Sequence, residues 1–267
     1  MTKISIKTLK EEKNRLLISA TASSNEFSHL EDNFIRTQVA NNYMKFNTLS
    51  KYIVDRGEKN IVSIYDPNNA SYSKGFIRNF QKSLIHNGGN ELVDKIAITD
   101  SYESIKAKIN SHDIDSILII ANSIDSAKLI QYLKLNKIDK PIICSGWAKT
   151  LDFIDEGGKS VEDVIFTTGY DDNSEDKNYL KFVKLFEKKH GKKPSVFSAQ
   201  AYETASIVIR NLKKSNNLDN LQKNILSEKE YKGLQGNIVF DKFGDVNREY
   251  FMMSVKNGKY IRVSNIE

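Results

Sequence analysis

Short apolar runs alternate with helix-like stretches through the middle of the chain. Five runs predict buried strands: 61–65, 92–98, 116–121, 141–144 and 164–168. Four stretches between them place apolar residues at helical spacing: 43–54, 76–84, 105–109 and 127–133. Strands buried on both faces and joined by helices are typical of a parallel, doubly wound sheet, so an α/β fold is expected.

The pattern changes on either side of this region. Residues 16–18 form an apolar run that predicts a buried strand leading into a hydroxyl-rich loop over 19–28. After Tyr170 the spacing predicts three helices and then three strands: 179–186, 201–212 and 218–226, followed by 237–240, 250–255 and 260–263. Alanines 201 and 205 predict close packing of the second of these helices.

Helix starts can also be predicted from the sequence. Asp100, with Glu103 three residues later, resembles a capping box. Ser123 is expected to cap the helix that follows the run at 116–121.

Composition and charge narrow the class of protein. Hydrophobic residues make up 39% of the 267 residues, enough for a packed core. The net charge of +6 comes from dispersed residues, so a nucleic-acid partner is not expected. No apolar run approaches the ~20 residues of a membrane span, and residues 1–13 contain no apolar signal-peptide core.

The residues of common catalytic motifs are missing from the sequence. It contains no phosphate-binding loop, dinucleotide fingerprint or nucleophile elbow. The four histidines lie far apart, and Cys144 ends a buried run without a nearby base. We therefore expect a binding protein rather than an enzyme, with no catalytic residue, metal site or cofactor.

Six segments, taken in order, resemble the type I periplasmic binding proteins, and within them the branched-chain amino-acid receptor-like branch. Each segment is weak alone, and their order carries the resemblance: Leu17 to Ser24, Phe34-Ile35-Arg36-Thr37, Ile64 to Pro67 with Tyr72 to Gly75, Ser145-Gly146-Trp147-Ala148 with Gly157-Gly158, Ala201 to Ala205, and Gly233 to Asp245.

The resemblance implies a fold of two doubly wound parallel-sheet lobes, joined by hinge crossings and closing on a small ligand. The boundaries expected are 1–40 and 169–247 for lobe 1, and 41–168 and 248–267 for lobe 2. The family has further strand–helix units before its hydroxyl-rich loop, where this chain has only Met1 to Arg15. The first lobe is therefore expected to be incomplete, and the missing part would carry the signal peptide.

The resemblance also implies the binding residues. In the family the hydroxyl-rich loop receives the ligand, which corresponds here to Thr21, Ala22 and Ser23. The second lobe would contribute Tyr72, Asn122 or Ser123, Trp147 and, more weakly, Tyr170. For each, an ordinary structural role is the alternative: a polar turn for the loop, a core aromatic for Tyr72 and Trp147, and a helix cap for Ser123.

The function implied is extracytoplasmic capture of an amino acid or small carboxylate for an ABC transporter permease. The full-length form would be periplasmic, or extracellular and membrane-anchored. A ligand-sensing domain of a receptor or kinase is the alternative. Near Trp147 the family often has an acidic group for the ligand's ammonium, but this chain has Ser145-Gly146 there. Asp125 or Glu203 could substitute, and the ligand's identity stays open.

Overall fold

The computed structural model describes residues 5–7, 15–41, 43–215 and 218–263. Residues 1–13 were found to lack the apolar core of a signal peptide, and most of them lie outside the described residues. The chain divides into two units: 1–40 with 174–249, and 41–173 with 250–267. Each unit thus contains segments that are distant in the sequence. No helix among the described residues has the length and apolar character needed to cross a membrane.

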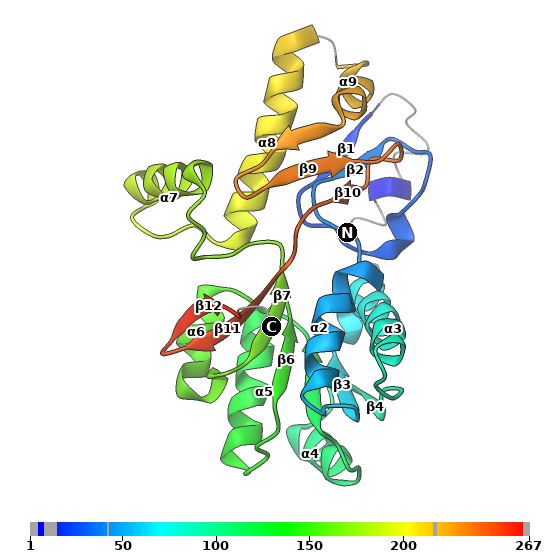
Figure 1. The fold of residues 1–267 in the computed structure, drawn as a ribbon, viewed down its shortest axis with the longest axis vertical. Helices are drawn as coiled ribbons and strands as arrows, with labels where there is room; N and C mark the ends of the chain where they lie inside the picture. The colour runs from blue at the N-terminus through cyan, green and yellow to red at the C-terminus, as the bar shows by residue number, and fades with distance from the viewer. Residues whose placement is uncertain (1–4, 8–14, 42, 216–217, 264–267) are drawn as a thin grey trace. The chain divides into compact units, whose positions relative to one another are not determined.

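The second unit is built on a seven-stranded sheet (Figure 1). Its strand order is β12-β11-β7-β6-β5-β3-β4. The neighbours from β7 to β4 pair in parallel, whereas β11 pairs antiparallel with both β7 and β12. The strands are β3 (Ile61–Tyr65), β4 (Asp94–Ala97), β5 (Ser116–Ile120), β6 (Ile142–Ser145), β7 (Ile165–Thr168), β11 (Phe251–Lys256) and β12 (Lys259–Arg262). The expected parallel, doubly wound arrangement is present here.

Helices cover both faces of this sheet. Helices α2 (Tyr43–Asp55) and α3 (Ala70–His86) pack their phenylalanines and leucines on one face. The other face carries α4 (Tyr102–Asn110), α5 (Ser123–Leu135) and α6 (Leu151–Gly157). Side chains of the central strand β5 alternate between the two clusters, with Leu118 on the first and Ile119 on the second. Its side chains are therefore buried on both sides, which explains the nearly continuous apolar run.

Two predicted helix caps were wrong by one residue. Ser101, not Asp100, caps α4, with its hydroxyl accepting a hydrogen bond from the amide of Ser104. Asn122, not Ser123, caps α5. In both cases neighbouring polar residues can each serve as a cap, and only the backbone path decides between them.

The first unit contains two small sheets. Strands β1 (Leu17–Ser19) and β2 (Phe34–Arg36) form a parallel pair. Strands β8 (Glu230–Lys232), β9 (Asn237–Phe240) and β10 (Val246–Asn247) form an antiparallel sheet. The sequence analysis did not predict β8 or β10, which are only three and two residues long.

Three helices complete this unit. They are α7 (Lys177–His190), α8 (Val196–Ser215) and α9 (Leu221–Glu228). The predicted close packing of Ala201 and Ala205 was wrong, since both are exposed. The buried face of α8 instead carries Gln200, Glu203 and Ile207. Polar residues therefore face the unit's interior along much of this helix.

Gly146 follows β6 at a point of close backbone approach. A Cβ atom placed on it would lie 2.8 Å from the carbonyl oxygen of Thr167, whereas a Cβ on Gly169 would meet nothing within 4 Å. We expect Gly146→Ala to lower the free energy of unfolding by ~1–3 kcal/mol, because the strands must separate. Gly169→Ala serves as the control, with an expected change within ~0.5 kcal/mol. Urea unfolding measures both, and equal effects would contradict the close approach.

Candidate functional site

Several candidate residues lie at one edge of the seven-stranded sheet. Because its parallel strands end at a common edge, the segments after β3, β5, β6 and β7 lie along that edge. Tyr72 is in the first turn of α3, after β3, and Trp147 is in the turn after β6. The structure brings these two together: their rings lie 5.6 Å apart between centroids, at 80°.

The first turn of α3 is anchored to the end of β3. The Ser73 hydroxyl donates to the carbonyl of Asp66 at 2.8 Å, which sets the position of the neighbouring Tyr72. Tyr72 also packs on Phe76, whereas Trp147 belongs to neither large core cluster. Both rings are partly buried. The pair therefore joins the core to the sheet edge and offers an aromatic surface there.

Burial also affects the Tyr72 hydroxyl. Desolvation raises its pKa to about 12, and the nearby Ser145 hydroxyl acts in the opposite direction. Tyr72 is thus a neutral hydrogen-bonding group across the physiological pH range.

The structure also places the other predicted residues of this unit, Asn122, Ser123 and Tyr170. The Asn122 side chain accepts from the amide of Asp125 at 3.0 Å and donates to the Asp125 carboxylate at 2.6 Å. Ser123 is the first residue of α5, with a partly buried side chain. Tyr170 is only 2% exposed. Along this edge, Tyr72 and Trp147 are the candidates that the structure brings into direct contact.

The predicted hydroxyl-rich loop lies in the first unit, between β1 and β2. The hydroxyl of Ser19 accepts hydrogen bonds from the amides of Thr21 and Ala22, at 3.4 and 3.1 Å. Ser23 is buried and Thr21 is exposed. The amides of Thr21 and Ala22 are therefore used within the loop in this conformation.

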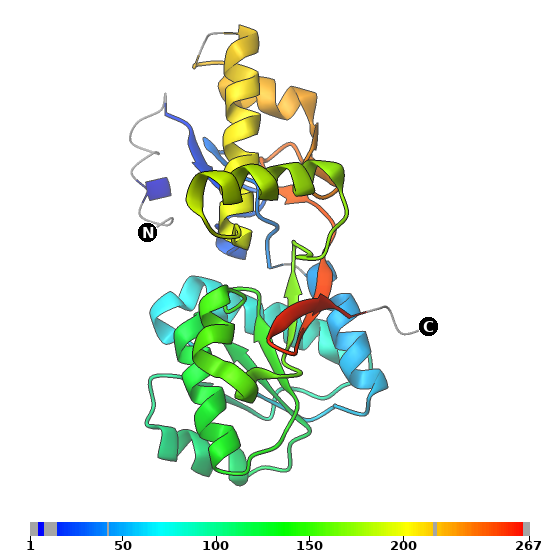
Figure 2. The same ribbon diagram turned by 90° about the vertical axis from the view of Figure 1, so that its left-hand side faces the viewer.

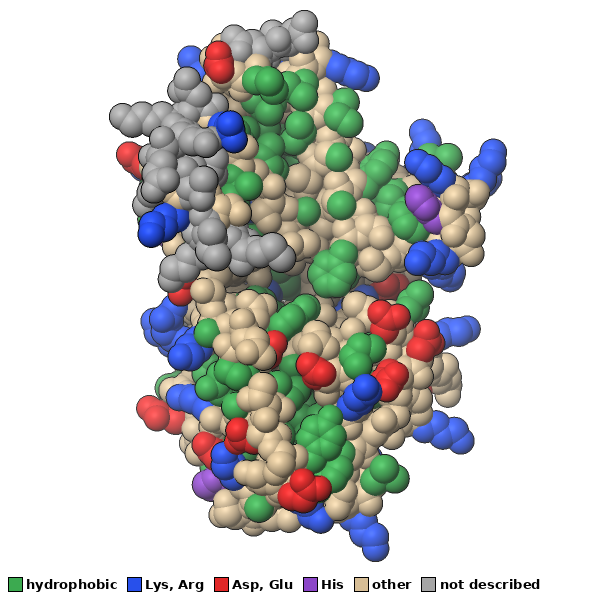
Figure 3. Space-filling view, turned by 180° about the vertical axis from the view of Figure 1, so that it is seen from behind, with side chains coloured by type: hydrophobic (Ala, Val, Ile, Leu, Met, Phe, Trp, Pro, Cys, Tyr) green, Lys and Arg blue, Asp and Glu red, His purple; other side chains and the backbone are tan. Residues whose placement is uncertain are grey.

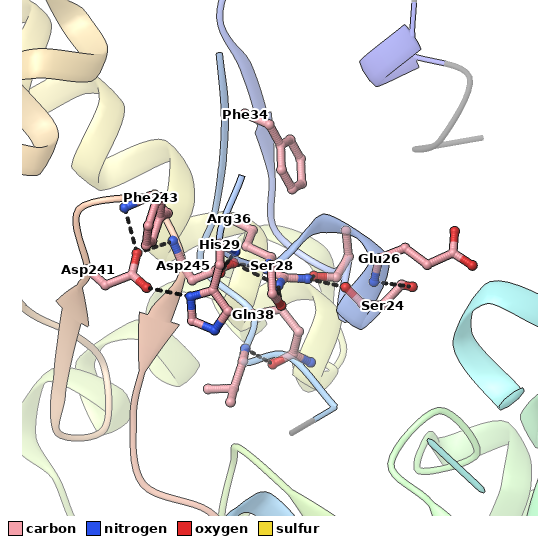
Figure 4. A network of polar contacts seen from close by, with 12 residues as sticks. Ser24, Glu26, Ser28, His29, Phe34, Arg36, Gln38, Asp241, Phe243 and Asp245 are labelled. Carbon is pink, nitrogen blue, oxygen red and sulfur yellow. Dashed lines mark hydrogen bonds and ion pairs between the residues drawn. The ribbon is translucent and has the colours of Figure 1, made fainter. Parts of the chain in front are cut away.

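Arg36, the last residue of β2, braces this loop (Figure 4). Its side chain is fully buried. The guanidinium donates to the carbonyls of Ala22 and Ser24 at 3.3 and 2.7 Å, and to the hydroxyl of Ser28 at 2.6 Å. It also donates from Nε to the Asp245 carboxylate at 2.7 Å. One planar cation thus holds both the loop and the β9–β10 turn.

The sequence analysis quoted Arg36 in a motif but did not assign it a role. A usable signal was present, because an arginine within the apolar run of Phe34 and Ile35 needs a buried partner. Its partner Asp245 lies 209 residues away, and no local pattern connects them.

The two carboxylates considered for a ligand's ammonium both have protein partners. The Asp125 carboxylate accepts a hydrogen bond from the side-chain amide of Asn122. Glu203 is buried and forms a two-pronged ion pair with Arg248, at 2.8 and 3.2 Å, while also accepting from the amide of Leu234. Glu203 therefore has no room for an incoming cation in this arrangement, whereas Asp125 is exposed and, among the described residues, accepts only a neutral side-chain amide.

One group of possible metal ligands is found among the described residues: His29, Asp241 and Asp245. One carboxylate oxygen of Asp245 accepts a hydrogen bond from the Arg36 guanidinium, and the other accepts one from the backbone amide of His29. Asp241 accepts the amides of Phe243 and Asp245 (Figure 4). The carboxylates therefore already bind protein donors, and the group is explained as part of the turn.

Cys144 lies inside the sheet, as expected. It is fully buried, and burial raises the pKa of its thiol. A protonated, inaccessible thiol is a poor nucleophile.

Comparison with known proteins identifies the family and the fold. The family profile described as periplasmic binding protein matches residues 5–259, and the chain belongs to this family. No curated protein sequence matches it significantly.

Among solved structures, a leucine-binding protein from Thermotoga maritima is 20% identical with a TM-score of 0.85, covering 98% of this chain and 75% of its own. The isoleucine complex of a branched-chain amino acid transporter substrate-binding protein from Streptococcus pneumoniae is 22% identical, with a TM-score of 0.85 and coverage of 98% and 76%. A benzoate complex of a solute-binding protein from R. palustris is 17% identical, with a TM-score of 0.86, and the match covers 98% of this chain and 73% of that protein. At these identities the likeness establishes the fold.

Removing one partner of the buried Arg36–Asp245 pair should destabilise the fold. We expect Arg36→Met to lower the free energy of unfolding by ~3–5 kcal/mol, because it leaves a largely buried carboxylate without its cation. Arg210→Met is a matched control, since Arg210 pairs with Glu228 at the surface and should contribute less than ~1 kcal/mol. Chemical denaturation measures both. Equal losses would show that Arg36 does not act through its buried partners.

The raised pKa of Tyr72 predicts a loss of stability in alkali. Its folded pKa of about 12 exceeds the ordinary tyrosine pKa of 10.0, so the folded state holds the proton more tightly. The contribution of protonated Tyr72 to the free energy of unfolding is complete below pH 10. It is lost as the pH rises from 10 to 12, by up to ~1.4 kcal/mol per pH unit. In Tyr72→Phe this part of the pH dependence should disappear. Unfolding measured at several pH values tests this, and an unchanged slope would refute it.

Proposed function

We propose that this protein is the solute-binding component of an ABC uptake transporter and that its ligand is a small carboxylate with an apolar or aromatic body. The contact between Tyr72 and Trp147 at the carboxyl edge of the sheet is the main support. Ligands of open α/β sheets bind outside the carboxyl ends of the strands, and aromatic rings there suit a flat or apolar ligand.

The ligand class follows from what the solved neighbours share. The solved structures described above are a leucine-binding protein and complexes with isoleucine and benzoate, and all three of these molecules carry a carboxylate on an apolar body. A carboxylate can be bound by hydroxyl and backbone donors without a buried counter-charge. We propose that the loop at Thr21 to Ser23 also contributes to binding, through its hydroxyl groups.

Glu203 is buried in its ion pair with Arg248, and this favours a ligand without an ammonium group in this proposal. Amino acids stay in the comparison because Asp125 is exposed and has no cationic partner among the described residues. Aromatic and aliphatic acids are therefore the first ligands to test, with amino acids as the comparison. Family membership supports a place outside the cytoplasm, in the periplasm or anchored at the outer face of a membrane.

Binding can be followed through the single tryptophan of the chain. A matching ligand should change the fluorescence of Trp147 and raise the melting temperature, with ~2.7 kcal/mol of stabilisation at a hundredfold excess over Kd. The panel should contain benzoates, aliphatic acids and amino acids. If no ligand of the panel gives a fluorescence change, a thermal shift or heat in calorimetry, the proposed ligand class is wrong.

Substitutions then locate the site. We expect Tyr72→Ala to weaken binding by at least ~5-fold. Tyr52→Ala is the control, because Tyr52 belongs to the same unit but lines a groove beside the start of β7 with Val164 and Ile165. Ser23→Ala tests the loop separately. A Tyr72→Ala protein with unchanged affinity and lower stability would assign Tyr72 to the core.

A further inference from the structure

Residues of α7, α8 and the β8 region line a groove in the first unit. Figure 2 shows α7 crossing α8 in this unit. Its volume is about 310 Å³. Phe182 and Tyr202 meet within it, with ring centroids 4.8 Å apart, and Leu185, Ile207 and Leu234 add apolar surface. Tyr202 is 48% exposed and Leu185 is 54% exposed. Two large apolar side chains thus face solvent at a concave surface, which is a feature of binding sites.

The rim of this groove is basic. Lys181, Arg210 and Lys232 line it, one from each wall. The lining contains one acid, Glu203, which is buried in its ion pair with Arg248. Arg210 shares the surface carboxylate of Glu228 with Lys214, which leaves the rim positive.

The positive charge extends over both helices. Residues 177–215 contain ten lysines and arginines but only two acidic residues, whereas the whole chain has a net charge of +6. The rest of the chain is therefore net negative, by two charges. Figure 3 shows basic side chains crowded around the projecting helix α7, next to apolar ones. Two of these ten residues, Lys181 and Arg210, line the groove, and the others lie on α7, on the end of α8 and on the segment between them.

We propose that the α7–α8 groove binds an acidic segment of a partner protein, which inserts one or two apolar side chains between Phe182, Leu185 and Tyr202. Lys181, Lys232 and Arg210 attract the acidic residues around those anchors. Desolvated aromatic anchors within a charged rim are the usual anatomy of such a contact. The groove lies within one unit, so this proposal does not depend on the solute.

Other occupants fit less well. A two-fold contact between copies of this chain would bring two strongly basic faces together. A lipid surface is flat, whereas an apolar hollow of this size accepts individual side chains. A nucleic acid would use the lysines but would leave the apolar floor unused.

The test uses the full chain and labelled acidic peptides with two Leu or Phe anchors three or four residues apart among glutamates. Each peptide has a scrambled partner of the same charge, and binding is followed by fluorescence anisotropy at 50 and 300 mM NaCl. At least one anchored peptide should bind tenfold more tightly than its scrambled partner. If none does, the proposal is overturned.

Variants assign that binding to the groove. Reversing Lys181 and Lys232 to Glu should weaken it at least tenfold. The matched control reverses the exposed Lys51 and Lys95 of the other unit and should change it less than twofold. Leu185→Ala should weaken peptide binding at least threefold at both salt concentrations.

Equal effects of the two charge reversals would overturn the proposal. Anionic vesicles or DNA that bind the chain as tightly as the peptide and compete with it would also overturn it.

Discussion

A parallel sheet must be covered on both faces, and much of the second unit follows from this constraint. Each parallel connection has to cross back over the sheet, so each one supplies a helix that buries a face. The same geometry places the carboxyl ends of the five parallel strands, β3 to β7, at one edge. Tyr72 and Trp147 are 75 residues apart in the sequence, yet their rings touch because β3 and β6 end at that edge. The candidate binding surface is thus a consequence of the topology.

The first unit depends on buried charge to a greater degree. Arg36 with Asp245 and Glu203 with Arg248 are two buried or nearly buried ion pairs, each joining segments distant in the sequence. Removing two charges from water is costly, and further hydrogen bonds offset part of this cost here. Arg36 donates to two carbonyls and a hydroxyl, and Asp245 and Glu203 each accept a backbone amide. These pairs orient the hydroxyl-rich loop and α8, so they determine local geometry more than they add net stability.

Helix α8 shows how these pairs change a helix. Its buried face carries Gln200, Glu203 and Asn211, while Ala201, Ala205 and Ile209 are exposed. An ordinary amphipathic helix has the reverse pattern. The buried polar side chains have partners such as Arg248 and the Tyr231 hydroxyl, which accepts from Asn211 at 3.0 Å. The exposed face of this unit is consequently more apolar than its helix spacing alone would suggest.

The sequence by itself determined the alternation of strands and helices over 61–168, because most strands there are runs of apolar residues long enough to be recognised, with β4 the exception. It also contained the ordered motifs that identified the family. Helix caps were predicted one residue away, since adjacent polar residues have similar capping ability. The partners of Arg36 and Glu203, the contact of Tyr72 with Trp147 and the exposed face of α8 were decided only by the tertiary structure. They join residues tens to hundreds of positions apart, and only the folded chain brings such residues within hydrogen-bonding or packing distance.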